Sequence, residues 1–412
     1  MLVLVIAAVV GEPRGDHADW RREDARRVAV ELWPRSAAER AAIVEGAFDV
    51  WTDSAVDGES IVVAMRADAL GALALRGVPM RVQVDDLDAV AAAERVRLAR
   101  RVRDPQDRAA WFAEYRDLDE ITAFEDRMVA RRPEVVRTRE LGRSIEDEPV
   151  RAIEISRGGS LRIVLNGGQH AREWISVMVA TCVADRLADE RDPRVRGVLD
   201  RVRFTIVPVA NPDGYRYSWE RDRYWRKNRR GGYGVDLNRN YSVAWGGRGS
   251  SGWRRSEMYR GEAPFSEPET RAMAAAFDGD PVAAHVDFHS YSQLVLYPWS
   301  HTATPPPDRD RFAAVADRMA SALVAAHGKR YQIRAGSDLQ VGASGTLPDW
   351  SYGERRALAF TIELRPARGP DGFVLPPEQI VPTCDESFAA VLELADQVIR
   401  AGAPTAPDRS SG

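Results

Sequence analysis

Short apolar runs of strand length alternate with longer helical stretches over most of this chain, and this alternation limits the fold more than any other feature. From about residue 110, the runs predict strands at Ile153–Ile155, Arg162–Leu165 and Arg203–Pro208, and helices at Trp174–Asp189, Arg309–His327 and Glu386–Ala401. Strands that alternate with helices indicate an α/β fold with a mixed, mostly parallel sheet flanked by helices. Residues 109–402 are long enough for one large enzyme domain, which is the interpretation we adopt.

A different order of elements precedes this region. The sequence predicts a strand at Val28–Leu32, a helix from the N-cap Ser36 to Glu45 with Glu39 as its capping-box partner, strands at Phe48–Trp51 and Ile61–Met65, a helix at Ala67–Arg76 and a strand at Met80–Val84. This β-α-β-β-α-β order is the split βαβ arrangement of a small α+β, ferredoxin-like domain. We expect this domain to occupy residues 21–108, including the segment that joins it to the larger one.

The joining segment and the two ends of the chain have distinct compositions. Leu87–Arg103 predicts an arginine-rich helix, which is either a solvated helix or a protease-sensitive linker within Arg95–Arg108. The apolar run Leu2–Val10 within residues 1–20 is either the core of a leader peptide or an ordinary N-terminus. Residues 403–412 have the composition of a flexible tail.

Charge and cysteine content exclude several classes of protein. The net charge is −4, which provides no electrostatic reason for nucleic-acid binding. No apolar segment reaches the roughly 20 residues that a membrane-spanning helix needs. The two cysteines, Cys182 and Cys384, exclude a disulfide-rich scaffold, and we expect both to be small core residues. The excess of arginine over lysine is typical of a GC-rich coding sequence of the bacterial type.

Histidine and glutamate side chains gather where two apolar runs end. His170 and Glu173 follow the run Arg162–Leu165 and its Gly167-Gly168 turn, and His289 ends a second run. Two histidines and one glutamate form a catalytic zinc set that leaves one position open for water. A histidine and a glutamate three residues apart are a weak signal alone, and a single histidine at a strand end is more often structural.

Two further segments carry charged groups in unusual settings. Trp225–Arg229 and Gly234–Asn240 are rich in arginine and asparagine, which suits a site that grips a carboxylate, although a solvated loop has the same composition. Glu363 interrupts the apolar run Ala359–Leu364. A buried carboxylate is unfavourable unless it pairs or takes part in chemistry, and beside a metal it is a candidate general base.

Together these segments resemble the zinc metallocarboxypeptidases of the carboxypeptidase A/B type. The resemblance is carried, in the family's order, by His170–Trp174, Asn211–Tyr215, Asp236–Asn240, His289–Gln293 and Phe360–Arg365, and by Tyr115–Ile121, which is similar to the start of the mature enzyme. It covers residues from about 110 to 400. The preceding domain looks like the family's activation domain.

The resemblance implies a role for each matched residue. His170, Glu173 and His289 would bind one Zn²⁺, and Glu363 would act as the general base toward zinc-bound water. Arg229 would polarise the scissile carbonyl. The substrate contacts implied for the C-terminal residue and its carboxylate are Asn238, Arg239, Arg172 and Arg226, with pocket residues Ala343, Thr346, Pro348 and Thr361.

Two departures from the family pattern affect substrate binding. Val341, with Gln340 beside it, falls where the family usually has a mobile tyrosine, so we expect weaker substrate capture. Pro348 falls where members specific for arginine or lysine have an acid, which favours apolar or aromatic C-terminal residues. Asp349 is adjacent, and a shift of one residue would reverse that inference.

The expected protein is therefore a secreted, monomeric zinc exopeptidase, made as a zymogen, that acts on peptide C-termini. An activating protease would cut near Arg100–Arg108. Two alternatives remain open: a carboxypeptidase for cell-wall peptides, and a zinc-holding module that binds peptide C-termini without cutting them. The missing tyrosine motivates the second alternative, whereas a base at Glu363 opposes it.

Overall fold

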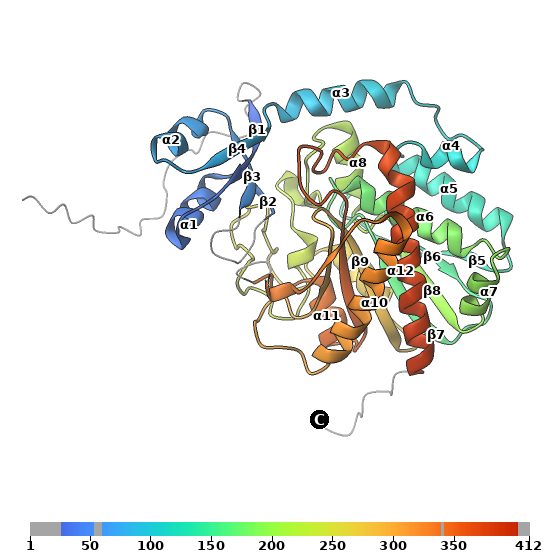
Figure 1. The fold of residues 1–412 in the computed structure, drawn as a ribbon. Coiled ribbons are helices and arrows are strands. Elements are labelled where there is room, and N and C mark those ends of the chain that lie inside the picture. The colour runs from blue at the N-terminus through green and yellow to red at the C-terminus, as the bar shows by residue number, and fades with distance from the viewer. Residues whose placement is uncertain (1–25, 53–59, 339–341, 403–412) are drawn as a thin grey trace, which may run out of the picture.

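Two β-sheets organise the protein, one in each part of the chain. The computed structural model describes residues 26–52, 60–338 and 342–402. The predicted leader and C-terminal tail lie outside these residues, as do Gln340 and Val341. Figure 1 shows the small sheet and its helices at one side of the large domain, with the long helix α3 spanning the top between them.

The N-terminal domain has the predicted split βαβ fold. Its elements are β1 (Arg27–Leu32), α1 (Ala37–Gly46), β2 (Asp49–Thr52), β3 (Ile61–Arg66), α2 (Ala69–Leu75) and β4 (Met80–Val84). The strands form an antiparallel sheet in the order β2-β3-β1-β4. Alternate residues of β1, including Val28 and Val30, enter the domain core, as their spacing predicts. Only half of the expected capping box forms.

At the start of α1, the Ser36 hydroxyl accepts a hydrogen bond from the Glu39 N–H, which is the first of the two bonds of a capping box. The Glu39 carboxylate instead accepts the N–H of Arg35, one residue before the cap. The joining helix α3 (Leu87–Ala99) is also shorter than the expected Leu87–Arg103, and Arg100 is its C-cap. An irregular segment then leads to α4 (Arg108–Phe112).

The large domain is built on a mixed eight-stranded sheet. The strands are β5 (Val136–Arg143), β6 (Pro149–Ile155), β7 (Leu161–Asn166), β8 (Val202–Val207), β9 (Val282–Ser290), β10 (Leu294–Tyr297), β11 (Gln332–Ala335) and β12 (Leu358–Leu364). Their order is β11-β10-β12-β9-β7-β8-β6-β5. The central strands β8, β7, β9 and β12 are mutually parallel, and antiparallel pairs occur toward both edges.

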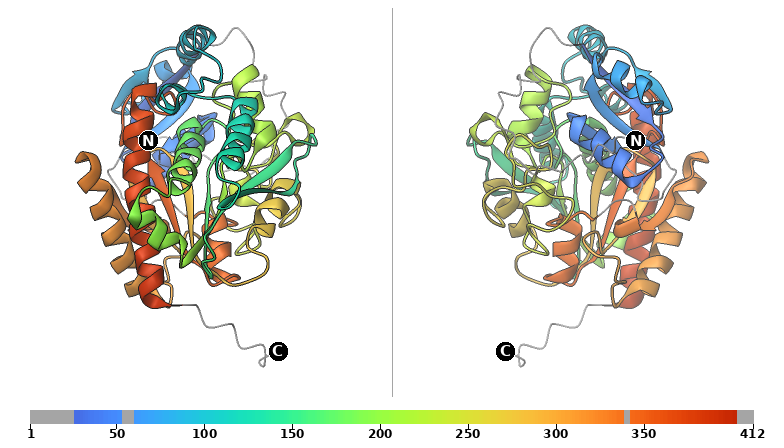
Figure 2. Two further views of the ribbon diagram at one scale, coloured as in Figure 1. Left: turned by 90° about the vertical axis from the view of Figure 1, so that its right-hand side faces the viewer. Right: turned by 90° about the vertical axis from the view of Figure 1, so that its left-hand side faces the viewer.

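Helices cover both faces of this sheet (Figure 2). One face packs against α5 (Leu118–Arg131), α6 (Trp174–Leu187), α7 (Pro193–Leu199), α8 (Pro212–Glu220), α10 (Arg309–His327) and α12 (Ile380–Ala401). The other face packs against α9 (Pro268–Ala275) and α11 (Leu347–Gly353). The hydrophobic core on the α6 and α12 side is called the first core, and the core on the α9 and α11 side is called the second. On β7, Ile163 and Leu165 enter the first core and Val164 enters the second. The central strands are apolar throughout because both faces are buried.

The two cysteines, predicted only as small core residues, are also bonded to each other. Cys182 on α6 and Cys384 on α12 form a disulfide, with their Cα atoms 6.1 Å apart. Both residues are buried in the first core, as expected of small apolar side chains. Helix α12 begins at Ile380, earlier than the predicted Glu386, so Cys384 lies within the helix and faces α6. A sequence separation of 202 residues gave no local signal for this pairing.

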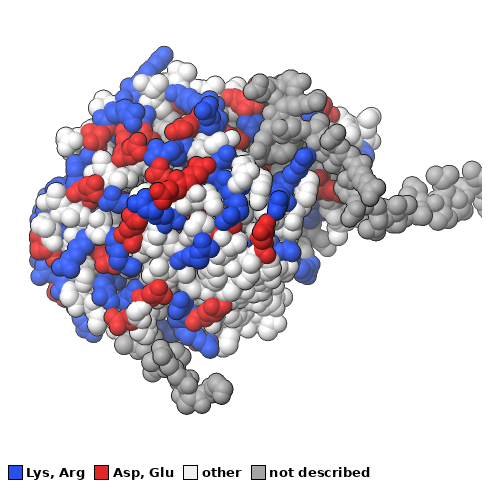
Figure 3. All heavy atoms as spheres, turned by 180° about the vertical axis from the view of Figure 1, so that it is seen from behind, with Lys and Arg blue, Asp and Glu red and all other residues white. Residues whose placement is uncertain are grey.

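Charged side chains of both signs are interspersed over the face drawn in Figure 3. Many arginines there and elsewhere pair with nearby carboxylates, as Arg157 does with Glu190 and Asp200. In the described part of the chain, no helix is both long and apolar enough to cross a membrane.

Candidate active site

The predicted metal ligands converge at the carboxyl ends of two neighbouring parallel strands. β7 and β9 are paired, so the loop after β7 meets the end of β9 at one edge of the sheet. His170 lies in that loop, Glu173 precedes the first turn of α6, and His289 is near the end of β9. The turn needs Gly168, which has φ +62° and would place a Cβ 2.8 Å from Val177.

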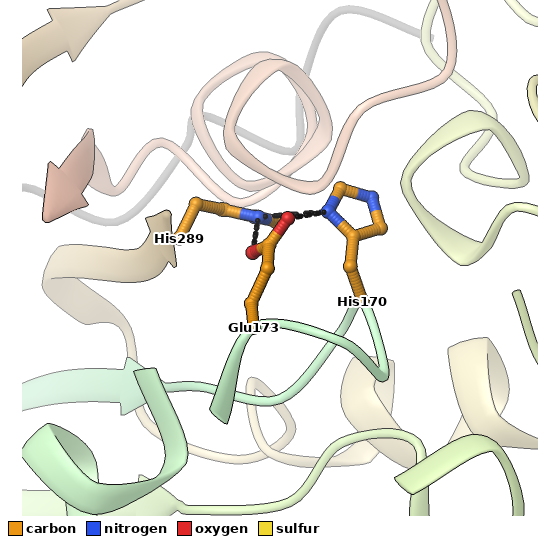
Figure 4. Close-up of side chains that lie close together, drawn as sticks. All are labelled: His170, Glu173 and His289. Carbon is orange, nitrogen blue, oxygen red and sulfur yellow. Dashed lines mark hydrogen bonds and ion pairs between the residues drawn. The ribbon is translucent and has the colours of Figure 1, made fainter. Parts of the chain in front are cut away.

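The three side chains point toward one another (Figure 4). The Nδ1 atom of His170 lies 2.8 Å from one carboxylate oxygen of Glu173, and the Nδ1 atom of His289 lies 2.9 Å from the other. The candidate ligand atoms are all within 4.8 Å of one another, and all three residues are buried. Two imidazoles and one carboxylate are the donor set of a catalytic zinc site, so these residues fit the ion.

Each histidine is oriented by a second carboxylate. The Nε2 atom of His170 lies 3.2 Å from Asp236, and the Nε2 atom of His289 lies 2.9 Å from Asp287. With Nε2–H donated to these carboxylates, both Nδ1 atoms are free of hydrogen and face the centre of the cluster. Burial opposes the charge on Glu173, but the two histidines hold its pKa below the usual value.

Amide side chains in turn hold Asp287. Asn166 donates to one of its oxygens at 2.6 Å and Gln169 to the other at 2.9 Å. The Oδ1 atom of Asn166 accepts a hydrogen bond from Nε2 of His285, and the Ser351 hydroxyl lies 2.9 Å from the opposite ring nitrogen. All of these groups are buried. The network therefore holds Asp287 in place, and Asp287 in turn fixes the orientation of the His289 ring.

Glu363 lies beside the metal ligands on β12. In the parallel register of β12 and β9, Glu363 is the direct partner of His289, so both side chains share one face of the sheet. Burial raises the pKa of Glu363 to about 8, with the charge of Glu173 acting in the same direction and that of His289 against it. A carboxylate with a raised pKa next to a metal site is suited to proton transfer.

The structure separates the two arginines that follow Trp225. Arg226 lines the cavity above the metal ligands, and its Nη2 atom lies 2.9 Å from Asp236. Arg229 does not line that cavity; its guanidinium lies over the rings of Tyr217 and Trp225, 3.5 and 4.4 Å from their centres. Arg226, and not Arg229, thus lies among the residues that line this cavity, and the carbonyl-polarising role expected of Arg229 stays a prediction. Both arginines lie in a polar loop, so spacing alone could not tell them apart.

The other predicted site residues share one cavity. It is lined by His170, Arg172, Glu173, Arg226, Asn238, Arg239, His289, Ala343, Thr346, Pro348, Thr361 and Glu363. Asn238 and Arg239 belong to a short 3-10 helix, Leu237–Arg239, whose cap is Asp236. Arg239 is held by backbone carbonyls of Gly249 and Asn238.

Asp349 does not belong to the pocket. Its carboxylate accepts hydrogen bonds from the backbone N–H groups of Ser300 and His301, and lies 2.7 Å from the ring nitrogen Nδ1 of His301. Pro348 lines the cavity whereas Asp349 does not. The preference for apolar or aromatic C-terminal residues, which depends on Pro348 being the pocket residue, stays a prediction.

The N-terminal domain reaches into the mouth of the same cavity. Asp49, at the start of β2, forms an ion pair with Arg172. Trp51 stacks on Tyr224, with ring centres 5.6 Å apart, and meets the edge of Phe373 at 5.1 Å. A second buried ion pair joins Glu94 on α3 to Arg223.

Sequence reasoning missed two positioning residues, Asp236 and Asp287. Asp287 had a usable signal, because residues i and i+2 of a strand share a face, and Asp287 precedes His289 by two positions on β9. Asp236 belongs to a segment that was singled out only for its arginine and asparagines. Its role depends on a loop conformation that brings it under His170.

Comparison with known proteins agrees with this geometry. The protein family described as "Zinc carboxypeptidase" matches residues 121–390 of this chain. Zinc carboxypeptidase A 1 of Anopheles gambiae is 36% identical over 314 residues, covering 74% of this chain and 72% of that protein. Carboxypeptidase A1 of Rattus norvegicus is 32% identical over 368 residues, covering 85% of this chain and 87% of that protein.

A solved structure also matches both domains. The crystal structure of thrombin activatable fibrinolysis inhibitor superposes with a TM-score of 0.82 at 28% identity, covering 92% of this chain and all of that one. That coverage includes the split βαβ domain. The relatives named here come from animals, and nothing in these matches supports a bacterial source.

Proposed function

Because the chain belongs to the zinc carboxypeptidase family, we propose that it removes the C-terminal residue of peptides at the cavity between His289 and Arg239. One observation carries this proposal. A zinc donor set, a buried carboxylate with a raised pKa and an arginine-asparagine pair line the same cavity. A module that only bound peptide ends would have no use for the carboxylate at Glu363.

The residues divide the chemistry among them. Zinc held by His170, Glu173 and His289 would supply a Lewis acid that polarises the carbonyl and acidifies water. Glu363 takes the proton of the attacking water and then delivers it to the leaving amine. Arg226 donates to the oxygen on which negative charge develops, in a buried setting where such a donor is effective.

Asn238 and Arg239 make the enzyme an exopeptidase. A guanidinium and an amide side chain bind a free carboxylate with directional hydrogen bonds, and only the last residue of a peptide offers one. Arg172 and Arg226 supply further positive charge along the cavity.

The residue removed is apolar or aromatic rather than basic. Ala343, Thr346, Pro348 and Thr361 line the pocket without a carboxylate, and Asp349 is engaged by backbone N–H groups. A lysine or arginine side chain would therefore lose its hydration without gaining an ion pair.

The N-terminal domain, within residues 21–108, is an inhibitory prodomain, and the chain is a zymogen. Its Asp49 forms an ion pair with Arg172, one of the cations proposed to meet the substrate. Its Trp51 packs against Tyr224 and Phe373. The solved relative described as thrombin activatable supports activation by a protease. Within the joining segment, Arg103 and Arg101 both pair with Asp117, but Arg103 is 66% exposed whereas Arg101 is 10% exposed and also pairs with Glu120, which favours cleavage after Arg103.

We also propose that the protein is secreted. The Cys182–Cys384 disulfide is suited to an oxidising compartment. We expect the secreted enzyme to act as a monomer.

The decisive experiment measures release of C-terminal phenylalanine from a short peptide by the full chain loaded with zinc, before and after limited trypsin treatment. Chelation should abolish activity and zinc should restore it. Glu363→Gln should lower kcat by about 10²–10⁴-fold while peptide binding persists. Glu393→Gln, a change on α12 far from the cavity, is the matched control. Activity that resists chelation, or a fully active Glu363→Gln, would refute the proposal.

A further inference from the structure

One cation in the substrate pocket has no part in the reaction described above. Arg334 lies on the edge strand β11 and lines the cavity. Its direct partner on β10 is Leu296, and the partner of Leu296 on β12 is Thr361. Cross-strand partners share a face, so Arg334, Leu296 and Thr361 form one row across the pocket side of the sheet.

The alternation of side chains confirms which face this row occupies. Val295 and Ile362 are fully buried in the core on the opposite side, and Ile333 packs against that core. Glu363, two residues beyond Thr361, faces the pocket. The base and Arg334 therefore share a face of the sheet.

The distance along this row suits a long substrate side chain. Adjacent strands lie about 4.8 Å apart, so the Cα atom of Arg334 is roughly 10 Å from that of Thr361. Residue 336 is a glycine that also lines the pocket, and a Cβ there would meet the Ser300 hydroxyl at 2.2 Å. The glycine therefore lets Ser300 pack closely against this end of β11.

The polar groups around Arg334 do not neutralise it. Its Nη2 atom donates to the Gln332 side chain at 2.9 Å. Among residues 26–52, 60–338 and 342–402, no ion pair joins a carboxylate to this guanidinium. Asp349, which follows the lining residue Pro348, is turned to the backbone of Ser300 and His301.

We propose that Arg334 is a specificity-determining residue that lets the pocket accept C-terminal glutamate in addition to apolar and aromatic residues. The proposal rests on the exopeptidase function above, in which Asn238 and Arg239 hold the α-carboxylate. The side-chain carboxylate then lies over Leu296 and pairs with the Arg334 guanidinium. Glutamate reaches farther along the row than aspartate, and lysine is repelled.

The test compares peptides that end in glutamate and in glutamine, which have the same shape and differ in charge. The ratio of their kcat/KM values is measured for the zinc-loaded chain after trypsin treatment. Arg334→Gln should lower this ratio about tenfold. Arg334→Lys should retain part of the preference. Arg330→Gln, an exposed arginine just before β11, is the matched control.

Binding measurements separate this proposal from the proposed function. In a Glu363→Gln background, the ratio of the dissociation constants of the two peptides reports on Arg334 even without turnover. If phenylalanine is released but the glutamate-to-glutamine ratio is the same with and without Arg334, the specificity proposal is overturned and the exopeptidase stands. If no peptide is cut under any condition, the proposed function fails, and equal binding of both peptides would remove the Arg334 proposal as well.

Discussion

At the scale of single residues, the chemistry depends on which of two nearby arginines faces the metal ligands. Arg226 lines the cavity and pairs with Asp236, whereas Arg229 stacks on Tyr217 and Trp225. Arg226→Gln should therefore lower kcat by about 10²–10³-fold, as loss of an oxyanion donor does. Arg229→Gln removes the same charge outside the cavity and should keep kcat within a few-fold. Steady-state kinetics on one peptide compares them, and the reverse order of effects would refute the assignment.

Asp287 should control how tightly zinc is held. Asparagine at this position keeps the shape but cannot accept hydrogen bonds on both sides, so His289 loses its fixed orientation. Asp287→Asn should raise the zinc dissociation constant by about 10–100-fold. Competition with a chromophoric chelator measures this on the full chain. Asp280→Asn, an exposed change just before β9, should leave zinc affinity unaltered, and equal affinities for both variants would contradict the role.

His285 should make the fold sensitive to mild acid. Burial lowers the pKa of His285 from 6.5 to about 4. Between these pH values, His285 is protonated in the unfolded chain but neutral in the folded protein. Stability is therefore lost as the pH falls from about 6.5 to 4, by up to roughly 3 kcal/mol. His285→Gln can still donate to Asn166 and does not titrate. Its midpoint of thermal unfolding should fall less between pH 7 and pH 4.5 than that of the unchanged protein. Equal falls would show that His285 carries none of this dependence.

At the scale of elements, the predictable parts of the fold were those with a local pattern. The alternation of Val28, Val30 and Leu32 and the apolar run through β7 were enough to predict their strands. His289 and Glu363 became neighbours only through the pairing of β9 with β12, which connects residues far apart in the chain. The position of Arg334 on the pocket face likewise depends on the register of β11 with β10. Motifs predicted which residues matter, and sheet pairing determined how they face one another.

The disulfide between α6 and α12 shows the same limit, because no local pattern joins Cys182 to Cys384. A cross-link that closes a loop of about 200 residues should stabilise the fold by roughly 2–5 kcal/mol. The double variant Cys182→Ala/Cys384→Ala should unfold at lower denaturant concentration than the oxidised protein. Reductant should shift the unchanged protein toward the variant and leave the variant unmoved. A shift of similar size in both would show that the disulfide is not the source.

At the scale of the whole molecule, the two domains meet through a few specific contacts. Asp49, Trp51 and Glu94 of the N-terminal domain contact Arg172, Tyr224, Phe373 and Arg223 of the large domain. Arg172 also lies over the Phe373 ring, 4.1 Å from its centre. The N-terminal domain therefore presents a carboxylate to a cation of the cavity, and under the zymogen proposal this ion pair would both hold the domain and block the site.

Breaking that pair should make the intact chain active before any cleavage. Asp49→Ala leaves the guanidinium of Arg172, which is 2% exposed, buried without its partner, and such a loss weakens an interface substantially. Release of C-terminal phenylalanine by the uncut chain should rise about tenfold or more, whereas activity after trypsin should match that of the unchanged protein. Asp68→Ala breaks an ion pair within the prodomain, with Arg66, and should leave the uncut chain as it was. An uncut Asp49→Ala chain no more active than the unchanged one would mean that Arg172 is not where the prodomain inhibits. A difference that persisted after trypsin would place the effect in the enzyme rather than in its release.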